Sequence, residues 1–237
     1  MKRTPGAWVH GFLGWGNYLF WTVTVGVFIA LGALNPTDRL RRFGGAALSW
    51  CWGRFMWWTT PFWWRRWEGL EHLADGPFII VANHQSTIDI PCLFGLPLPL
   101  KVSARPGIFR VPVMGRFLSL SGQVDTDRFF EQSVEALDAG ISIVVFPEGS
   151  RSADGSVQRF HSGAFKLAVQ TGRPILPVAM DGAQEIMSKR AYFPTALVAN
   201  VKIRVLPPLV PGDDAKALSQ EARQRIVDAL ADLRKAA

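Results

Sequence analysis

The chain has 237 residues and a formal net charge of +7, from 26 Lys and Arg against 19 Asp and Glu. All ten tryptophans lie at or before Trp67, together with eight basic residues and one acid, so the charge excess belongs to residues 1–67. Because these basic residues are interleaved with Trp and aliphatic residues, they favour anionic lipid headgroups over nucleic acid, for which no recognition motif is present. With only two cysteines, a disulfide framework is not expected.

Residues 1–67 predict a membrane-associating helical segment. No formally charged residue occurs between residues 4 and 37, and residues 18–34 approach the ~20 apolar residues that cross a bilayer. A second apolar and aromatic stretch, residues 43–64, is interrupted by an arginine and a proline and is a poor span. Basic residues flank both stretches, so we expect a helical hairpin that enters one leaflet. A single transmembrane helix and a cleaved signal are the alternatives.

Residues 68–237 predict an α/β domain, a layered sheet with flanking helices. Continuous apolar runs indicate buried central strands at residues 78–81 and 141–146. Between them, apolar residues at helical spacing predict a helix over residues 129–139, with Gly140 as its C-terminal cap. Four further elements complete the alternation, a helix at 164–170, a strand at 175–180, an edge or half-exposed strand at 201–206 and an amphipathic helix at 213–235.

A histidine and a carboxylate follow the first central strand, in the run Asn83-His84-Gln85-Ser86-Thr87-Ile88-Asp89. Ligands bind beyond the carboxyl ends of strands in α/β sheets, so this position favours His84 as a general base over a structural histidine. Five residues along a helix separate two side chains onto different faces, so contact requires His84 in the loop and Asp89 in the first helical turn. Alternatively, Ser86 and Asp89 form a capping box, although Pro91 argues against such an early helix start.

The second central strand is followed by Phe146-Pro147-Glu148-Gly149-Ser150-Arg151-Ser152. Its proline and glycine predict a sharp turn whose amides could hold an oxyanion or a phosphate, with Arg151 as a bidentate donor. An ordinary turn with a solvated arginine is the alternative. Glu148 would repel a phosphate, so we expect it to hold an arginine or a backbone amide. No second glycine follows Ser150, which argues against a hydrolase nucleophile elbow.

Taken together, the two runs favour acyl transfer to an alcohol that carries a phosphate, and four blocks of the sequence resemble the glycerolipid acyltransferases. The blocks are residues 83–89, 122–128, 146–152 and 175–179, and they are most similar to those of bacterial 1-acyl-glycerol-3-phosphate (lysophosphatidic acid) acyltransferases. The resemblance implies that His84 and Asp89 form the catalytic dyad, and that the acceptor phosphate is bound by Arg105, Arg128, Glu148, Gly149 and Arg151. Departures from the family pattern are Asp125 and Thr126 for an apolar pair, Arg105 for a lysine and Ser150 for a threonine.

The resemblance further implies transfer of a fatty acyl group from acyl-CoA or acyl carrier protein to the sn-2 hydroxyl of 1-acyl-glycerol-3-phosphate, giving phosphatidic acid. No cofactor and no metal are expected, since the His and Cys residues lack metal-ligand spacing. The expected partners are the lysophospholipid, the acyl thioester and, through residues 1–67, membrane lipids, with the enzyme domain on the cytoplasmic face of the inner membrane. Alternatives are a different acceptor, such as glycerol-3-phosphate or a lyso-aminolipid, and a membrane-tethered lipid-binding protein without turnover.

Overall fold

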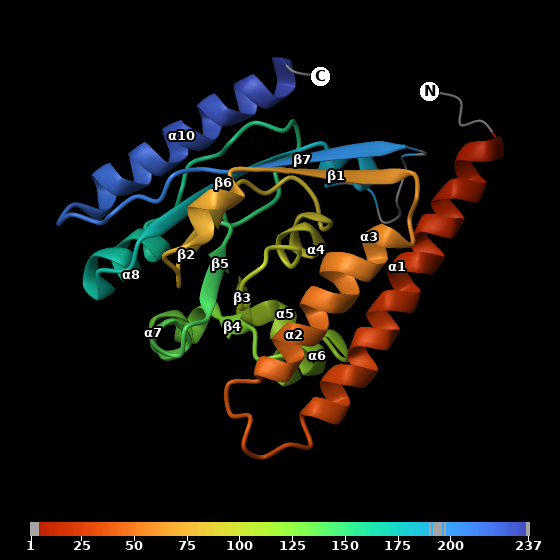
Figure 1. Ribbon diagram of the computed structural model, residues 1–237, viewed down its shortest axis with the longest axis horizontal. Helices are drawn as coiled ribbons and strands as arrows, with labels where there is room; N and C mark the ends of the chain where they lie inside the picture. Colours follow the sequence, from red (N-terminus) through yellow and green to blue (C-terminus); the bar gives the residue numbers. More distant parts are fainter. Residues whose placement is uncertain (1–4, 190, 192–195, 197, 236–237) are drawn as a thin grey trace.

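A seven-stranded sheet in the order β1-β7-β6-β2-β5-β3-β4 forms the centre of the computed structural model, which describes residues 5–189, 191, 196 and 198–235 (Figure 1). The predicted class, a layered α/β sheet with flanking helices behind an N-terminal helical hairpin, is confirmed in its architecture. The strands are β1 Trp63–Glu68, β2 Ile79–Ala82, β3 Leu100–Ala104, β4 Val124–Asp125, β5 Ser142–Val145, β6 Ile175–Asp181 and β7 Ala199–Val205.

The central strands β2 and β5 are parallel neighbours, with Ile79 opposite Ile143 and Val81 opposite Val145. Apart from Ser142 at the start of β5, both strands are apolar because the sheet is covered on both faces. Successive residues of a strand point to opposite faces, so Ile80 packs in the core on the hairpin side while Ile79 and Val81 pack in the core on the other side. The shared direction of β2 and β5 brings the segments that follow them to the same edge of the sheet.

Three helices cover the second face of the sheet, α7 Phe129–Asp138, α8 Gly163–Thr171 and α10 Ala215–Lys235 (Figure 1). Each corresponds to a helix predicted from the sequence. Gly140 ends α7 with a φ of 79°, as its predicted capping role requires. The buried residues of α10 recur at helical spacing and pack in the same core as β6 and α8, at Leu218, Ala222, Ile226, Leu230 and Leu233.

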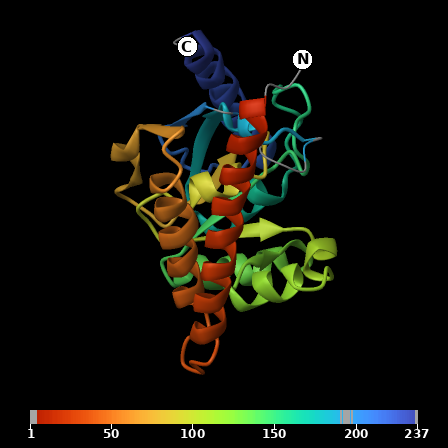
Figure 2. The same cartoon turned by 90° about the vertical axis from the view of Figure 1, so that its right-hand side faces the viewer.

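The first face is covered by the N-terminal hairpin (Figures 1 and 2). Its first arm is α1 Pro5–Gly32, and its second arm is continuous through α2 Arg42–Trp50, the π-helix η1 Cys51–Phe55 and α3 Met56–Trp58. Within the described chain, one helix is long and apolar enough to cross a membrane by length and composition, over Phe12–Gly32. Gly53 lets the second arm approach the domain closely, because a Cβ there would lie 2.3 Å from the carbonyl oxygen of Phe94.

The boundary expected between residues 67 and 68 falls inside β1, which pairs in parallel with β7. Because β1 lies beyond β7 in the sheet, β7 is not an edge strand, but its alternating burial confirms the half-exposed strand predicted at residues 201–206. The sequence of β1 did not predict a strand, because a cation, Arg65, occupies a position that faces the interior. Its guanidinium lies over the rings of Trp57 and Trp67 and donates hydrogen bonds to carbonyl oxygens of the hairpin and of the helix α4 Asp89–Leu93.

Short elements complete the chain between these layers. They are the 3₁₀-helices η2 Leu70–Leu73 and η3 Thr126–Arg128, and the helices α5 Pro106–Phe109, α6 Met114–Leu120 and α9 Ala183–Ile186. The α5–α6 segment lies beside α1 on the side away from the second arm of the hairpin (Figure 2).

Candidate active site

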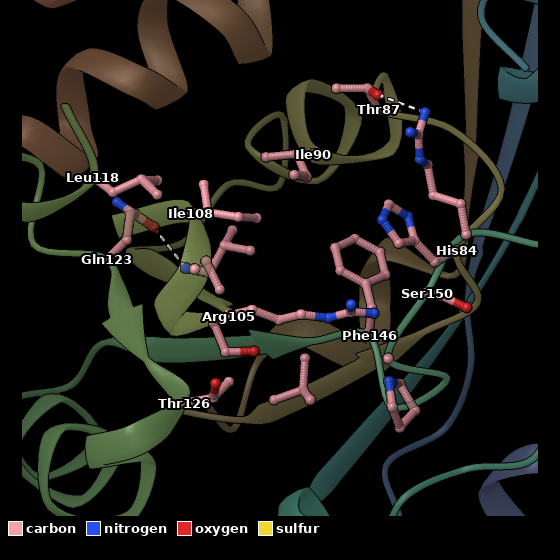
Figure 3. A pocket seen from close by; sticks show the side chains of 18 of the residues that line it. His84, Thr87, Ile90, Arg105, Ile108, Leu118, Gln123, Thr126, Phe146 and Ser150 are labelled. Atoms are coloured by element: carbon pink, nitrogen blue, oxygen red, sulfur yellow. Dashed lines mark hydrogen bonds between the residues drawn. The ribbon is translucent and has the colours of Figure 1, made fainter. Parts of the chain in front are cut away.

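A cavity of about 1150 Å³ opens at the carboxyl ends of β2 and β5 (Figure 3). The loops that follow these strands supply its polar end, including His84 and Arg151. Its walls are largely apolar and come from α4, from the α5–α6 segment and from the hairpin, which contributes Tyr18, Leu48 and Trp52. The cavity therefore joins both predicted parts of the chain and combines a charged end with room for a hydrocarbon chain.

The imidazole and the carboxylate of the first run are in contact. His84 Nδ1 lies 2.8 Å from Asp89 Oδ2, and the same oxygen accepts hydrogen bonds from the amides of Gln85 at 2.7 Å and Ser86 at 2.8 Å. The helix α4 begins at Asp89, so His84 lies in the loop and Asp89 in the first turn, as predicted. Sequence reasoning treated backbone capping and orientation of His84 as alternatives, but the completely buried Asp89 does both.

His84 presents its second nitrogen toward the cavity (Figure 3). Because Nδ1 faces a carboxylate, the neutral imidazole carries its proton there and leaves Nε2 as the free base. The ring stacks on Phe146, with centroids 4.1 Å apart and planes inclined by 22°. The backbone of His84 is also fixed, since its carbonyl accepts a hydrogen bond from the amide of Ser152 at 2.7 Å. The ring therefore has one defined orientation at the cavity wall.

Glu148 holds the two active-site loops together and does not line the cavity. One carboxylate oxygen accepts the amide of His84 at 2.8 Å, and the other accepts the amide of Gln158 at 3.0 Å. Burial raises the pKa of Glu148 above its usual value, and the hydrogen bonds from the two amides partly offset that rise. The expectation that this carboxylate holds a backbone amide is confirmed, whereas the contact with an acceptor phosphate implied by the resemblance has no support in its position.

Gly149 and Arg151 do line the cavity, on the same side as His84. Gly149 has a φ of 68°, and a Cβ there would lie 3.2 Å from Nε2 of His161, so both its conformation and its surroundings favour glycine. Arg151 donates a hydrogen bond to the hydroxyl of Thr87 at 3.0 Å, which turns its guanidinium toward the first loop (Figure 3). The predicted convergence of an imidazole and a guanidinium on one cavity is confirmed.

The two remaining predicted cations have different positions. Arg105, directly before α5, extends its side chain into the cavity toward Phe146 (Figure 3). Arg128 is exposed and pairs with Glu131, with nitrogen–oxygen distances of 2.6 and 3.2 Å. That hydrogen-bonded pair raises the pKa of Arg128. In the described chain, the neighbours of Arg128 line the cavity but its own side chain does not.

Sequence reasoning missed two cavity residues that carry or can carry positive charge. Lys189, in the segment after α9, lines the cavity, and no local pattern marks it because its position depends on how that segment returns to the site. His161 also lines the cavity. Its amide donates a hydrogen bond to the carbonyl of Pro147 at 2.8 Å, and its nearness to the second run was the signal that could have identified it.

Comparison with known proteins assigns this arrangement to a family. The acyltransferase family model matches residues 65–181, starting within β1. The chain is 35% identical over 185 residues to the chloroplastic 1-acyl-sn-glycerol-3-phosphate acyltransferase of Arabidopsis thaliana. This alignment covers 72% of this chain and 50% of that protein. It is 32% identical over 167 residues to the 1-acyl-sn-glycerol-3-phosphate acyltransferase of Pseudomonas aeruginosa, covering 65% of this chain and 62% of that one.

A solved structure gives the same assignment over nearly the whole length. The crystal structure of the 1-acyl-sn-glycerophosphate acyltransferase from Thermotoga maritima superimposes with a TM-score of 0.79 at 27% identity, covering 94% of this chain and 95% of that one. The protein thus belongs to the acyltransferase family. Within that family it is similar to the 1-acyl-sn-glycerol-3-phosphate acyltransferases, as the four sequence blocks implied. The chain spans about half the length of the two plant relatives that it matches.

Proposed function

We propose that the protein transfers a fatty acyl group from an acyl thioester to the free sn-2 hydroxyl of 1-acyl-glycerol-3-phosphate, giving phosphatidic acid. The observation that carries this proposal is the convergence of the His84–Asp89 pair with the cations of Arg105 and Arg151 in one cavity with apolar walls. The names of the relatives support the same acceptor. A donor bound to coenzyme A or to acyl carrier protein supplies the same thioester chemistry.

In the proposed reaction, Nε2 of His84 removes the proton of the acceptor hydroxyl as its oxygen attacks the thioester carbonyl. The tetrahedral intermediate then collapses with cleavage of the carbon–sulfur bond, and the imidazolium returns its proton to the departing thiolate. Asp89 stabilises the imidazolium that exists between these steps and holds the ring in the required tautomer. No covalent enzyme intermediate and no cofactor are needed.

The cations of the cavity orient the acceptor. Arg105 and Arg151 can contact a phosphate bidentately, and Lys189 adds a third positive charge on the cavity lining. Holding the phosphate fixes the hydroxyl in attacking geometry beside His84. Apolar residues of the hairpin and of the C-terminal end of α4, such as Trp52 and the capping residue Phe94, provide a wall for acyl chains.

The exposed surface of the hairpin supports attachment of the protein to a membrane. Phe20, Val23 and Val27 are exposed on one face of α1, and Trp50 and Trp58 are exposed on the second arm. Such an apolar surface with tryptophans suits insertion into one leaflet, with the Trp rings at headgroup depth. We assign this leaflet to the cytoplasmic face of the inner membrane, where acyl thioesters are made.

One assay tests the function. Purified full-length protein is given acyl-CoA or acyl carrier protein with 1-acyl-glycerol-3-phosphate, glycerol-3-phosphate or lysophosphatidylethanolamine, and thiol release and lipid mass are followed. Phosphatidic acid is the expected product, and His84→Ala should lower its formation by about 10²-fold or more. The matched control is His72→Ala, which removes a partly exposed histidine of η2 outside the cavity.

Each other outcome has a clear meaning. Turnover of another acceptor in preference to 1-acyl-glycerol-3-phosphate would correct the substrate while retaining the reaction class. If the protein binds lysolipid equally well with and without His84→Ala and releases no thiol, it is a membrane-tethered lipid-binding protein and not an enzyme. Undiminished turnover in the purified His84 variant would refute the proposed base.

A further inference from the structure

A second cavity, of about 560 Å³, lies between α1 and the α5–α6 segment. Figure 2 shows this segment alongside α1, on the side away from the second arm of the hairpin. Phe117 of α6 lines both cavities, so α6 stands between this cleft and the candidate active site. The lining residues that bear on its chemistry are Gly26, Ile29, Arg110, Val111, Val113 and Arg116.

Gly26 leaves an open notch in the α1 wall of this cleft. A Cβ at this position would meet no heavy atom within 4 Å, so packing inside the protein does not require a glycine there. Glycine in a helix interior is destabilising relative to alanine, because it loses more backbone freedom on folding. The notch therefore provides space along an otherwise apolar helix, next to the buried Ile29.

The opposite wall of the cleft carries a strained apolar turn. Val113 has φ 68° and ψ −58°, and the amide of Met114 bonds to the carbonyl of Pro112 at 2.8 Å, which makes a γ-turn of the rare, strained kind. Positive φ is unusual for a β-branched residue. This turn holds the side chain of Val113 83% exposed, with Val111 also exposed beside it. An apolar surface of this kind is unfavourable in water and suits an apolar surrounding.

The cleft also carries positive charge. Arg110 and Arg116 both line it and are exposed, and in the described chain no carboxylate forms an ion pair with either of them. Neither residue lines the candidate active site. A ligand complementary to these walls has a hydrocarbon chain for the notch and an anionic group for the two guanidiniums.

We propose that this cleft binds one anionic phospholipid of the membrane at a site separate from the active site. Its acyl chain lies along Gly26, Ile29 and Phe117, and its phosphate lies between Arg110 and Arg116. The cleft is continuous with the exposed apolar face of α1, so the site rests on the membrane attachment proposed above. The bound lipid is a second contact between protein and leaflet, which fixes the α5–α6 wall against the bilayer.

Photo-crosslinking tests this site. Full-length protein is bound to phosphatidylcholine vesicles that contain phosphatidylglycerol with a photoactivatable acyl chain, and the adducts are mapped by mass spectrometry after digestion that does not depend on arginine. We expect adducts on residues 109–120 and around Gly26. Removal of one arginine, in Arg110→Gln or Arg116→Gln, should lower this labelling roughly fivefold, the factor expected for one basic residue near an anionic surface.

The controls separate the site from general membrane binding. The same photolabel on phosphatidylcholine should give weaker labelling that the arginine variants leave unchanged, and Gly26→Leu should reduce labelling by both lipids because it fills the notch. Arg225→Gln removes an exposed arginine of α10 and should change nothing. Thermal unfolding of each variant shows whether it folds as the unaltered protein does.

Two results would overturn the site. Equal labelling by the two lipids with no effect of the arginines would remove its anionic selectivity, and adducts confined to other parts of α1 would remove the cleft itself. Protein that fails to float with vesicles would reject the membrane attachment and this site together. The acyl transfer assay with dispersed substrates would still report on the proposed reaction, so the two failures are distinguishable.

Discussion

The two sides of the active-site cavity are built differently. On the side of the strand-end loops, polar side chains are buried and hydrogen-bonded, as in Asn83, which bonds to both the amide and the carbonyl of Met180 at 2.8 Å. On the α5–α6 side, the helices carry exposed apolar residues, among them Ile108 and Met114. One side is fixed by internal bonds, whereas the other presents apolar surface outward.

This difference indicates a division of labour. General base catalysis requires a side chain held within a few tenths of an ångström, which buried hydrogen bonds provide. Binding of a lipid requires apolar area and a few charges, which exposed short helices provide. Changes on the loop side should therefore lower kcat and stability, and changes on the α5–α6 side should act mainly on KM.

The largest effect is expected at Asp89. In Asp89→Asn the amide oxygen can take the place of Oδ2 and keep its three hydrogen bonds, while the amino group occupies the position of Oδ1, which has no hydrogen-bond partner. The fold and the tautomer of His84 survive, but the imidazolium loses its counter-charge. We expect kcat to fall by about 10²-fold or more, with KM little changed, in steady-state assays.

Asp89→Ala provides the contrast, because it removes the acceptor of all three bonds. It should lower the free energy of unfolding by about 1–3 kcal/mol in addition to the loss of activity, since buried amides lose their partner. Equal stability of the Asn and Ala variants in denaturant titrations would show that this loop does not depend on Asp89. The loop side would then be no more rigid than the α5–α6 side.

Glu148→Gln tests the same rigidity one step away from the chemistry. Gln keeps one oxygen acceptor, so one of the amides of His84 and Gln158 loses its partner. We expect the free energy of unfolding to fall by about 1–3 kcal/mol and kcat to fall roughly tenfold, without a matching rise in the acceptor KM. A change confined to KM would instead place Glu148 in acceptor binding.

The pH dependence of Glu148 has a defined sign. Burial raises its pKa in the folded protein above 4.5, so the folded state holds the proton more tightly than the unfolded state does. The contribution of this group to stability is full below the unfolded pKa and is lost as the pH rises through the raised value. The stability difference between the unaltered protein and Glu148→Gln should therefore shrink as the pH rises through that window.

The sequence predicted the fixed side of the cavity better than the other side. The apolar runs of β2 and β5 are explained by burial on both faces, and parallel strands bring their carboxyl ends to one edge. Those two facts place His84 and Arg151 on one cavity before any contact is known. The dual use of Asp89 was within reach as well, because each of its two roles was derived separately.

The remaining features depend on contacts between distant segments. Arg65 faces inward only because Trp57 and Trp67 flank its guanidinium. The residues of β1 therefore lack the alternation of apolar and polar side chains that would have predicted a strand. Tyr18 lines the cavity because the hairpin packs on the sheet, which its apolar composition alone does not indicate. Arg128 belongs to a sequence block, but Glu131 three residues later holds it at the surface.

Arg105 and Arg128 test the role of the α5–α6 side in binding the acceptor. The resemblance assigned both to the acceptor phosphate, but Arg105 lines the cavity and Arg128 does not. Arg105→Gln should raise the acceptor KM by about tenfold, the value of one charged hydrogen bond, with kcat nearly unchanged. Arg128→Gln, which removes the same charge from an exposed ion pair, should have little effect. A larger rise in KM for Arg128→Gln would show that Arg128 leaves Glu131 when the acceptor binds.

The smallest effect concerns the outer end of the loop side, at Asp154. Its carboxylate accepts hydrogen bonds from the Ser156 side chain and amide and from the Ser152 hydroxyl, and these lower its pKa from 3.8 to about 2. The stabilisation is present above the unfolded pKa and is lost as the pH falls through about 2. Asp154→Asn should therefore flatten the acid unfolding curve between these values, when unfolding is followed by tryptophan fluorescence. Identical curves for the two proteins would show that this loop is not held by its hydrogen bonds, and that the fixed side of the cavity ends nearer to Ser152.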